Sequence, residues 1–502
     1  MNKQIIRQLF IFLLVISIPY LISIIFVPKE YHFTGFLANP IDGHSYLSKM
    51  QEGRNGDWLF KLPYSKEQGD GVFLFTYYIF LGHIARTLSL PNIIVFHAAR
   101  LINAALLFFM IYVFIKNHFK PDRINYAIAL IIFGSGLGWI LLLFGYPASD
   151  IKIPEIYPLL ASYSNPHFPL AIGLMLLNFK LFLSEIRYKL IALFFLSVAL
   201  TIIQPFCMVI LLGVLGILTL VEWHEISKSR IYSLISLILP TIIFGTYLLY
   251  ITKYNASIRG WNSQNITPSP PVWDLMISLS PMFLLAIPGI YNIIKTKDRQ
   301  FYPLVIWMGM ALSLAYLPAN LQRRLLIGSY IPVAILGLYG MNLLINSTGK
   351  YWSLIRITIF AIALPTNLLI LSMSVYQVAN FNQNLVMKQN VWKSLLWVNH
   401  NIPQDSLIIT SPEVGLYIPA YSNNRVIYGH PFETTDAILN KGNVELFFTS
   451  MSSSEQQHYL MTEDVDYILV NSDSGYDFQP SLLISGNLVY NENEINIYKV
   501  NK

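Results

Sequence analysis

Long apolar runs alternate with short polar stretches over most of the chain, up to about Tyr376. Because about 20 apolar residues are needed to cross a bilayer, the pattern predicts about eleven membrane-spanning helices. The expected spans cover residues 9–27, 100–115, 126–144, 168–183, 190–221 as two short spans, 231–251, 275–294, 302–317, 325–344 and 354–376. The fold class expected is therefore a polytopic α-helical membrane protein with a large first outer loop.

Charged residues set the expected orientation, since Lys and Arg mark cytoplasmic loops. Residues 1–7 are basic, so the N-terminus is expected in the cytoplasm. The run 71–90 carries His83 and Arg86 and is interpreted as an amphipathic helix in the outer interface rather than as a span. The longest apolar run is expected to break at Gln204-Pro205, because proline interrupts helices. These assignments place the C-terminus outside.

The composition changes from about Asn380 onward. Short apolar stretches typical of strands occur at residues 406–410, 465–470 and 495–500, and helical stretches end near His400 and begin near Asn443. Strands that alternate with helices indicate a small α/β domain. The predicted domains are a transmembrane domain at 1–378 and an extracytoplasmic α/β domain at 379–502.

The overall composition supports this division. The chain is 54% hydrophobic and only 12% charged, against about 25% charged in soluble domains. Its 31 Tyr and 31 Phe suit aromatic belts at the membrane interface. No basic patch is interleaved with stacking aromatics, so no nucleic-acid partner is expected. The single cysteine, Cys207, excludes an intrachain disulfide.

The first outer loop carries an acid, an imidazole and a phenol at Asp42, His44 and Tyr46. In one interpretation Asp42 is a general base or a metal ligand, and His44 and Tyr46 contact the substrate. In the other, Asp42 is a solvated loop acid or the N-cap of a helix that begins near Tyr46. The sequence alone leaves both interpretations of Asp42 open.

Two adjacent arginines, Arg323 and Arg324, lie in a short turn that is expected on the outer side. The positive-inside bias disfavours arginine there. Guanidinium groups bind phosphate bidentately, so the pair is a candidate clamp for a lipid phosphate. The alternative is that both side chains extend to lipid headgroups.

The second outer loop contains Asp150, Glu155 and His167. Carboxylates and imidazoles ligate divalent cations, so these three residues, with Asp42 and His44 from the first loop, are candidate ligands of a divalent metal. No ligand spacing here is diagnostic, and each residue alone is more often an ordinary interfacial residue.

The chain resembles the GT-C superfamily of integral-membrane glycosyltransferases, in particular bacterial members akin to protein O-mannosyltransferases and the aminoarabinose transferase of lipid A. The resemblance extends over most of residues 1–376. The segments that carry it are Asp42-Gly-His-Ser-Tyr46, Gly53-Arg-Asn-Gly-Asp-Trp58, Phe73 to Leu90 followed by Arg100-Leu-Ile-Asn103, and Arg323-Arg324. The chain departs from the family at Asp42-Gly43, where an Asp-Glu doublet is common.

The resemblance implies transfer of a sugar from a polyprenyl-phosphate donor to a hydroxyl of a glycan, lipid or protein acceptor. The reaction would take place at the outer face of the plasma (inner) membrane. Asp42 would be the catalytic carboxylate, as a base or a metal ligand, Arg323 and Arg324 would bind the donor phosphate, and a divalent metal would be optional. Membrane lipids would surround the spans.

A further outer loop contains Trp261, Gln264 and Asn265. Trp261 is first interpreted as an interface anchor. It is also a candidate for stacking on a sugar ring, with Gln264 and Asn265 bonding to the sugar's hydroxyls.

Two other roles stay open, namely a polytopic lipid or glycan transporter such as a flippase, and a non-catalytic membrane scaffold. A transporter favours paired repeats and ionisable groups at the membrane midplane. The sequence has no clear internal repeat, and its ionisable groups gather at the outer boundary of the spans. This distribution favours chemistry at the surface.

Overall fold

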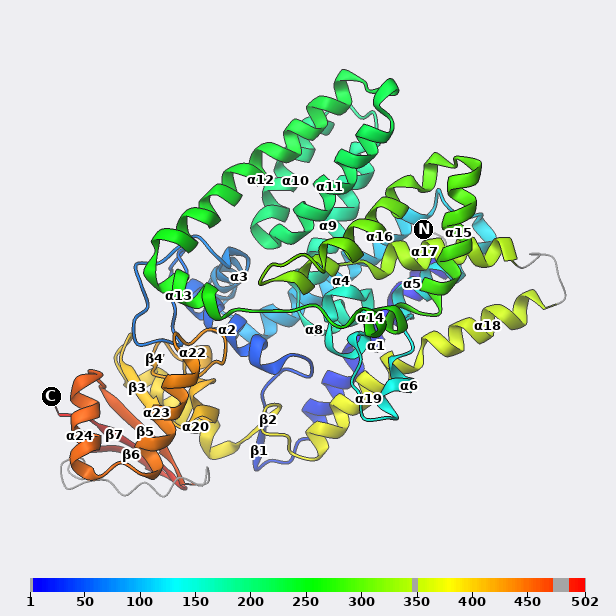
Figure 1. Cartoon of the computed structure of the whole chain (residues 1–502). Coiled ribbons are helices and arrows are strands. Elements are labelled where there is room, and N and C mark those ends of the chain that lie inside the picture. Colours follow the sequence, from blue (N-terminus) through cyan, green and yellow to red (C-terminus); the bar gives the residue numbers. More distant parts are fainter. Residues whose placement is uncertain (1–2, 345–350, 473–486, 502) are drawn as a thin grey trace. The chain divides into compact units, whose positions relative to one another are not determined.

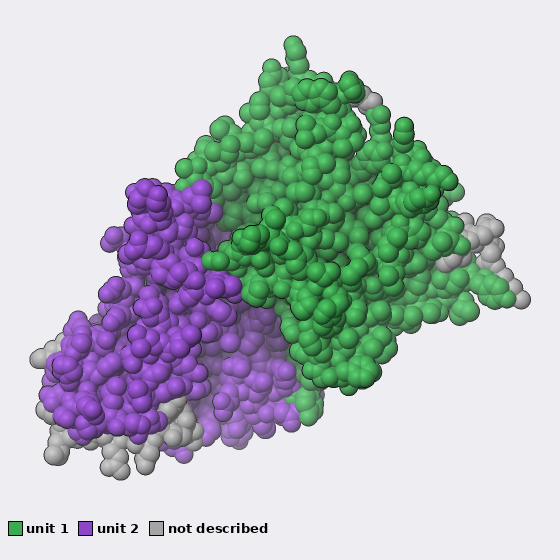
Figure 2. All heavy atoms as spheres, viewed as in Figure 1, with its two compact units in different colours: residues 1–22, 97–246, 267–376 green, residues 23–96, 247–266, 377–502 purple. Residues whose placement is uncertain are grey.

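In the computed structural model, residues 3–344, 351–472 and 487–501 are described (Figure 1). They form two compact units, each built from segments far apart in the sequence. Unit 1 contains residues 1–22, 97–246 and 267–376, and unit 2 contains residues 23–96, 247–266 and 377–502 (Figure 2). Unit 2 therefore combines the predicted first outer loop with the C-terminal segment.

Unit 1 is helical. Helices α1, α12 and α19 end in unit 2, and α4 begins there. The helices are α1 (Lys3–Phe26), α4 (Asn92–Ile115), α5 (Pro121–Phe133), α6 (Gly138–Leu142), α7 (Ser149–Lys152), α8 (Pro158–Ser164), α9 (His167–Phe182), α10 (Lys189–Ile203), α11 (Pro205–Val221), α12 (Lys228–Tyr254), α14 (Val272–Leu279), α15 (Met282–Thr296), α16 (Tyr302–Leu314), α17 (Tyr330–Leu344), α18 (Trp352–Ala363) and α19 (Pro365–Ala379), with 3₁₀ turns η1 (Pro154–Ile156), η2 (Trp223–Glu225), η3 (Arg299–Phe301) and η4 (Gln322–Leu326).

Each predicted span contains a helix. Within the described residues, five helical segments are long and apolar enough to cross a membrane, or six if a bent pair is counted as one span. The five are Lys3–Phe26, Asn92–Ile115, Pro121–Leu142, Lys228–Tyr254 and Trp352–Ala379. Shorter apolar helices are α9, α10, α11 and α17. The total of about eleven spans stays a prediction.

Proline positions explain where the apolar runs are interrupted. The run 190–221 ends one helix at Ile203 and begins the next at Pro205, as predicted. The run 275–294 was expected to be one span, but α14 and α15 meet at a bend of 86°. Pro281 lies at this bend, where it lacks the amide hydrogen that a continuous helix requires.

Unit 2 contains helices and two small sheets. Its elements are β1 (Tyr31–Phe33), α2 (Pro40–Asn55), α3 (Thr76–Thr87), α13 (Ala256–Gln264), β2 (Val386–Lys388), α20 (Gln389–Asn401), β3 (Leu407–Thr410), α21 (Pro412–Gly415), α22 (Ile418–Tyr421), β4 (Arg425–Val426), α23 (Ala437–Thr449), α24 (Ser453–Thr462), β5 (Tyr467–Asn471), β6 (Leu488–Glu492) and β7 (Ile495–Lys499). Strands β3, β5 and β7 lie where the sequence predicts strands.

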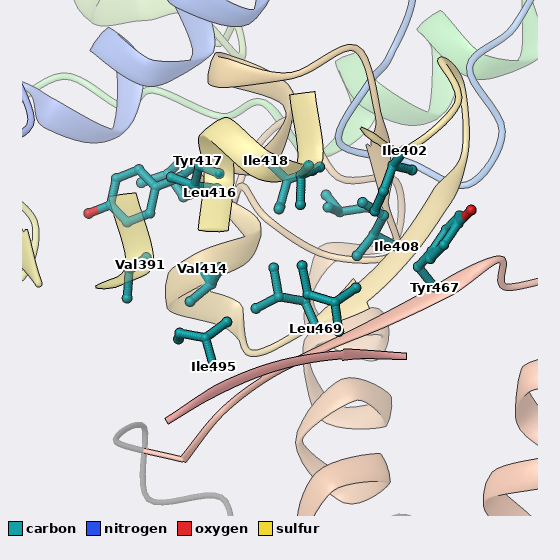
Figure 3. Packing of buried hydrophobic residues seen from close by; sticks show 14 of the residues in the cluster. Val391, Ile402, Ile408, Val414, Leu416, Tyr417, Ile418, Tyr467, Leu469 and Ile495 are labelled. Carbon is teal, nitrogen blue, oxygen red and sulfur yellow. The ribbon is translucent and has the colours of Figure 1, made fainter. Parts of the chain in front are cut away.

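The larger sheet has the strand order β4-β3-β5-β7-β6. Strand β3 pairs in parallel with β4 and β5, and β7 pairs antiparallel with β5 and β6. Alternate residues serve opposite faces, as the period of a strand requires. Ile408 and Leu469 pack with α20 in one core (Figure 3), whereas Ile409 and Ile468 pack with α23 and α24 in another. The sheet is thus covered by helices on both faces.

The first-loop helices α2 and α3 cross at two glycines. A Cβ on Gly53 would lie 1.9 Å from the backbone oxygen of Ile79, and one on Gly82 would lie 2.0 Å from that of Met50. Strand β1 pairs antiparallel with β2, which ties the start of the loop to the C-terminal segment. The domain boundary after residue 378 stays a prediction, because unit 2 also includes residues 23–96 and 247–266.

Candidate functional site

Helix α2 presents Asp42 in its first turn. Asn39 is the N-cap, with a left-handed backbone at φ 50°, and Pro40 opens the helix. The interpretation of Asp42 as the N-cap is therefore wrong, because Asp42 lies inside the helix. Its side chain is 49% exposed, so a substrate can reach the carboxylate.

Two turns further along α2, a charged group is buried. The Lys49 ammonium is 2.7 Å from Glu433 Oε1 and 3.0 Å from Glu433 Oε2, and the Lys49 side chain is fully buried. The Ser45 hydroxyl also donates to Glu433. Burial raises the pKa of Glu433, but Lys49 and His430 lower it, and the net pKa lies below the usual value. The carboxylate is therefore ionised at neutral pH.

Glu433 belongs to a short run, residues 430–435, which we call the 430–435 segment. Thr434 Oγ1 accepts hydrogen bonds from the backbone N–H groups of Gly429 and His430. Ser65 Oγ accepts from the backbone N–H of Thr435 at 2.8 Å. Side chains from the first loop and from the 430–435 segment itself thus fix this backbone.

His430 begins this segment, and its imidazole contacts both the backbone of the segment and the surroundings of Asp42. Its Nδ1 accepts hydrogen bonds from the backbone N–H groups of Phe432 and Glu433, both at 3.1 Å. Its Nε2 is 4.0 Å from Asp42 Oδ1. Burial lowers the pKa of His430, although Glu433 and Asp42 act in the opposite direction. The ring is therefore neutral at pH 7, with its hydrogen on Nε2, because Nδ1 accepts.

The other predicted first-loop residues are packed. His44 is fully buried, its Nδ1 is 2.7 Å from the carbonyl oxygen of Pro40, and burial lowers its pKa to about 4. The Tyr46 ring stacks on Tyr78 with centroids 4.1 Å apart. Both residues shape the surroundings of Asp42, and their contact with a substrate stays a prediction.

The predicted residues of the further outer loop, Trp261, Gln264 and Asn265, lie on α13 or at its end. Trp261 packs edge-on against Phe75. The Gln264 side chain donates to the carbonyl oxygens of Phe432 and Thr434. Asn265 is buried as the C-cap of α13. Gln264 therefore holds the 430–435 segment, and its predicted role toward a sugar stays untested.

In unit 1, Asp150 is fully buried. Its Oδ2 accepts from the backbone N–H groups of Gly136 and Gly138, both at 3.1 Å, and from Ser135 Oγ at 3.4 Å. Burial raises the pKa of Asp150 to about 6, although these hydrogen bonds lower it. Asp150 thus organises the Gly-rich turn after α5.

The remaining predicted residues of unit 1 lie at the ends of helices and turns. Glu155, in η1, pairs with Arg323 Nε at 3.5 Å. The Arg324 guanidinium lies 5.7 Å from the centre of the Phe206 ring. His167 is buried at the start of α9. Arg323 and Arg324 both lie in the 3₁₀ turn η4.

Two of the predicted metal ligands, Asp150 and Glu155, have other partners. Asp150 Oδ2 accepts backbone hydrogen bonds, and Glu155 faces a guanidinium. Across the parts of the chain that the structure describes, no three His, Cys, Asp or Glu side chains are grouped to hold a metal ion.

Sequence reasoning missed His430 and Glu433, since it names no candidate residue in the predicted α/β domain at 379–502. A signal was present: the run Gly429-His-Pro-Phe-Glu-Thr-Thr-Asp436 is polar and lies between apolar stretches. A polar run between two apolar stretches is expected to form a loop, and loops often carry functional residues.

No family model and no curated protein matches the chain. The oligosaccharyltransferase from Archaeoglobus fulgidus, tethered with an acceptor peptide, aligns with a TM-score of 0.54 at 13% identity, covering 92% of this chain and 69% of that chain. The same protein in complex with Zn and sulfate gives 0.53 at 14% identity, covering 91% and 67%. ArnT from Cupriavidus metallidurans gives 0.50 at 10% identity, covering 97% of both chains.

These proteins are membrane glycosyltransferases of the GT-C type. The chain has the GT-C fold. The resemblance predicted from the sequence is thus confirmed at the level of the fold, and the apolar helices make the chain an integral membrane protein. Identities of 10 to 14% do not transfer the roles of individual residues.

Proposed function

We propose that the chain is a glycosyltransferase that moves a sugar from a polyprenyl phosphate to a hydroxyl of a glycan, lipid or protein acceptor. The observation that carries the proposal is the exposure and position of the Asp42 carboxylate. In a chain with this fold, it is a half-exposed carboxylate in the first turn of a helix, and Nε2 of a buried imidazole lies 4.0 Å from it. A carboxylate that an acceptor hydroxyl can reach is suited to act as a general base.

In the proposed reaction, the acceptor oxygen attacks the anomeric carbon from the face opposite the phosphate. The bond between that carbon and the phosphate oxygen breaks, and its electron pair leaves with the polyprenyl phosphate. Asp42 takes the proton of the acceptor hydroxyl and later releases it to water. The sugar is thereby transferred with inversion.

Arg323 and Arg324 are proposed to bind the donor phosphate and the charge that it gains. Their cationic groups suit this role, because guanidinium matches phosphate oxygens bidentately. The pairing of Arg323 with Glu155 leaves the other guanidinium nitrogens to bind oxygens of a ligand. Trp261, His44, Tyr46, Gln264 and Asn265 are proposed only to shape the space around the sugar.

The membrane orientation is proposed as well. A basic N-terminus favours the cytoplasm, so the first loop and the C-terminal segment would lie outside the plasma (inner) membrane. A polyprenyl phosphate is a lipid, so its headgroup would reach Arg323 and Arg324 from the bilayer. The Archaeoglobus relative was solved with Zn and with an acceptor peptide, so a metal and a peptide acceptor remain part of the test.

The test is an assay of the purified full chain in proteoliposomes. The donor is a polyprenyl phosphate that carries a radiolabelled sugar, and the acceptors are a lipid extract, an oligosaccharide and a Ser/Thr peptide, each with and without a divalent metal. We expect label to move to one acceptor, and no transfer from a nucleotide sugar. Label that only changes leaflet would identify a transporter, and label that stays in place would identify a scaffold; either result contradicts the proposal.

A further inference from the structure

The catalytic proposal uses Asp42 but not the 430–435 segment beside it. This segment comes from the C-terminal part of the chain, almost 400 positions after Asp42 in the sequence. It brings a histidine and a glutamate to helix α2, and both side chains are buried. A merely connecting loop has no need of two ionisable groups in that position, since burying such groups is costly.

His430 is the informative member. It is 2% exposed, and among the described residues its Nε2 has no hydrogen-bond partner. Because Nδ1 accepts from two backbone N–H groups, the hydrogen of the neutral ring must be on Nε2. A buried N–H without a partner is unfavourable. The carboxylate that it faces is Asp42, whose Oδ1 is 4.0 Å away.

The ring cannot easily turn away. Its Nδ1 is fixed by the backbone of its own segment, and the next turn of that segment is held by the ion pair of Glu433 with Lys49. Ser45 adds a second donor to Glu433. The distance between His430 Nε2 and Asp42 exceeds a hydrogen bond by about 1 Å, and catalytic hydrogen bonds often tighten only when the substrate binds.

We propose that His430 is a positioning residue for Asp42, and that the C-terminal segment thereby completes the site. When the acceptor binds, Nε2–H donates to Asp42 Oδ1. This bond turns the carboxylate so that Oδ2 faces the acceptor hydroxyl. The inference rests on the proposed function, and it makes the C-terminal segment a part of the catalytic apparatus rather than a cover.

A matched pair of variants tests the role. In His430→Gln the side-chain amide nitrogen lies where Nε2 was, so the donor to Asp42 is kept. In His430→Asn the amide lies near the position of Nδ1 and does not reach Asp42. We expect His430→Gln to keep turnover within about threefold, and His430→Asn to lose on the order of 10- to 100-fold, the range for one hydrogen bond to a charged group. The KM for the donor should be unchanged in both variants.

Equal turnover in the two variants, with equal melting temperatures, overturns the inference, since reach would then not matter. The wild-type chain and Asp42→Asn are assayed in parallel. If the wild type transfers sugar and Asp42→Asn does not, the function stands whatever His430 does. If the wild type transfers none, the proposed function fails instead.

A second measurement needs no His430 variant and decides the matter if both variants unfold. In ¹⁵N-histidine-labelled protein, NMR distinguishes rings that carry hydrogen on Nε2 from rings that carry it on Nδ1. His44 must carry it on Nδ1, because Pro40 offers only a carbonyl oxygen there. In protein saturated with the acceptor, we expect one ring with Nε2–H to shift when Asp42 becomes Asn. If no such ring responds in the acceptor-bound protein, His430 does not donate to Asp42.

Discussion

Asp42 in unit 2 and Asp150 in unit 1 both come from predicted outer loops and lie in first turns of helices, but their surroundings differ. Asp150 is fully buried, and its Oδ2 accepts from two backbone N–H groups of a Gly-rich turn. Asp42 is 49% exposed, and its neighbour is one oriented imidazole. A carboxylate whose oxygen accepts hydrogen bonds from backbone N–H groups maintains structure. An exposed carboxylate with a fixed neighbour is available for chemistry.

The charged groups around each acid differ in the same way. Beside Asp42, Glu433 and Lys49 neutralise one another inside the protein and hold the 430–435 segment. Beside Asp150, the donors are neutral N–H and hydroxyl groups, and the pKa of the acid rises to about 6. Near Asp42 the protein buries a charge pair, whereas at Asp150 it buries a single acid that is easily protonated.

The largest effect is expected at the buried pair of unit 2. Lys49→Met leaves Glu433 buried without its counter-charge, which should lower the free energy of unfolding by about 3–5 kcal/mol. The measurement is thermal or denaturant unfolding in detergent. The double variant Lys49→Met/Glu433→Leu should recover most of this loss, because no unpaired charge remains.

A matched control exists on the surface of the same unit. Lys393 is 2.7 Å from Glu492, but both side chains are exposed. Lys393→Met should change stability by only about 0–1 kcal/mol. Equal losses for Lys49→Met and Lys393→Met would contradict the claim that the 430–435 segment is held by a buried pair.

Acid titration should show opposite signs in the two units. Asp150, with its pKa raised from 3.8 to about 6, holds a proton more strongly when folded, so its contribution is full below pH 3.8 and is lost as pH rises to about 6. The loss amounts to about 3 kcal/mol. Glu433 has a lowered pKa, so its contribution is present above pH 4.5 and is lost below it.

Unfolding measured between pH 3 and 7 checks both signs. Asp150→Asn should remove the fall in stability toward pH 6, and Glu433→Gln should remove the fall in strong acid. The account of Asp150 is wrong if Asp150→Asn leaves the pH dependence unchanged.

The arginine turn of unit 1 should affect the donor rather than the fold. Arg323→Ala removes a charged donor to phosphate, which we expect to weaken donor binding by about 1.5–3 kcal/mol. The KM for the polyprenyl-phosphate donor should rise on the order of 10- to 100-fold. Arg187→Ala, at an exposed position in the same unit, serves as the control. An unchanged KM in Arg323→Ala would remove the phosphate role.

The smallest expected effect concerns the turn that Asp150 organises. A Cβ on Gly138 would lie 1.7 Å from Asp150 Oδ1, so Gly138→Ala should cost about 1–3 kcal/mol of stability. Gly309 has no atoms near its Cβ position, and Gly309→Ala should be neutral or stabilising. Similar melting temperatures for the two variants would show that the turn tolerates rearrangement.

The sequence predicts the helices well, because long apolar runs leave few alternatives to a span. It also predicts the break at Gln204, where proline follows. It does not predict the 86° bend at Pro281, since proline can either kink or end a helix and the packing decides which.

The site was predicted only in part, for a physical reason. Asp42 stands out because it is polar in an apolar chain, but its partners His430 and Glu433 follow almost 400 positions later. No periodicity relates such distant segments, and only the packing of unit 2 brings them together. The metal site stays a prediction: Asp150 and Glu155 are close in sequence, but each has its own partner.

The most direct test of the account is the rate of sugar transfer by Asp42→Asn. Asp70→Asn, an exposed acid of the same loop, is measured beside it. Loss of a general base lowers rates by about 10²- to 10⁴-fold. We predict such a loss for Asp42→Asn with unchanged melting temperature, and none for Asp70→Asn. Full activity in a folded Asp42→Asn variant would contradict the central claim that Asp42 is the catalytic base.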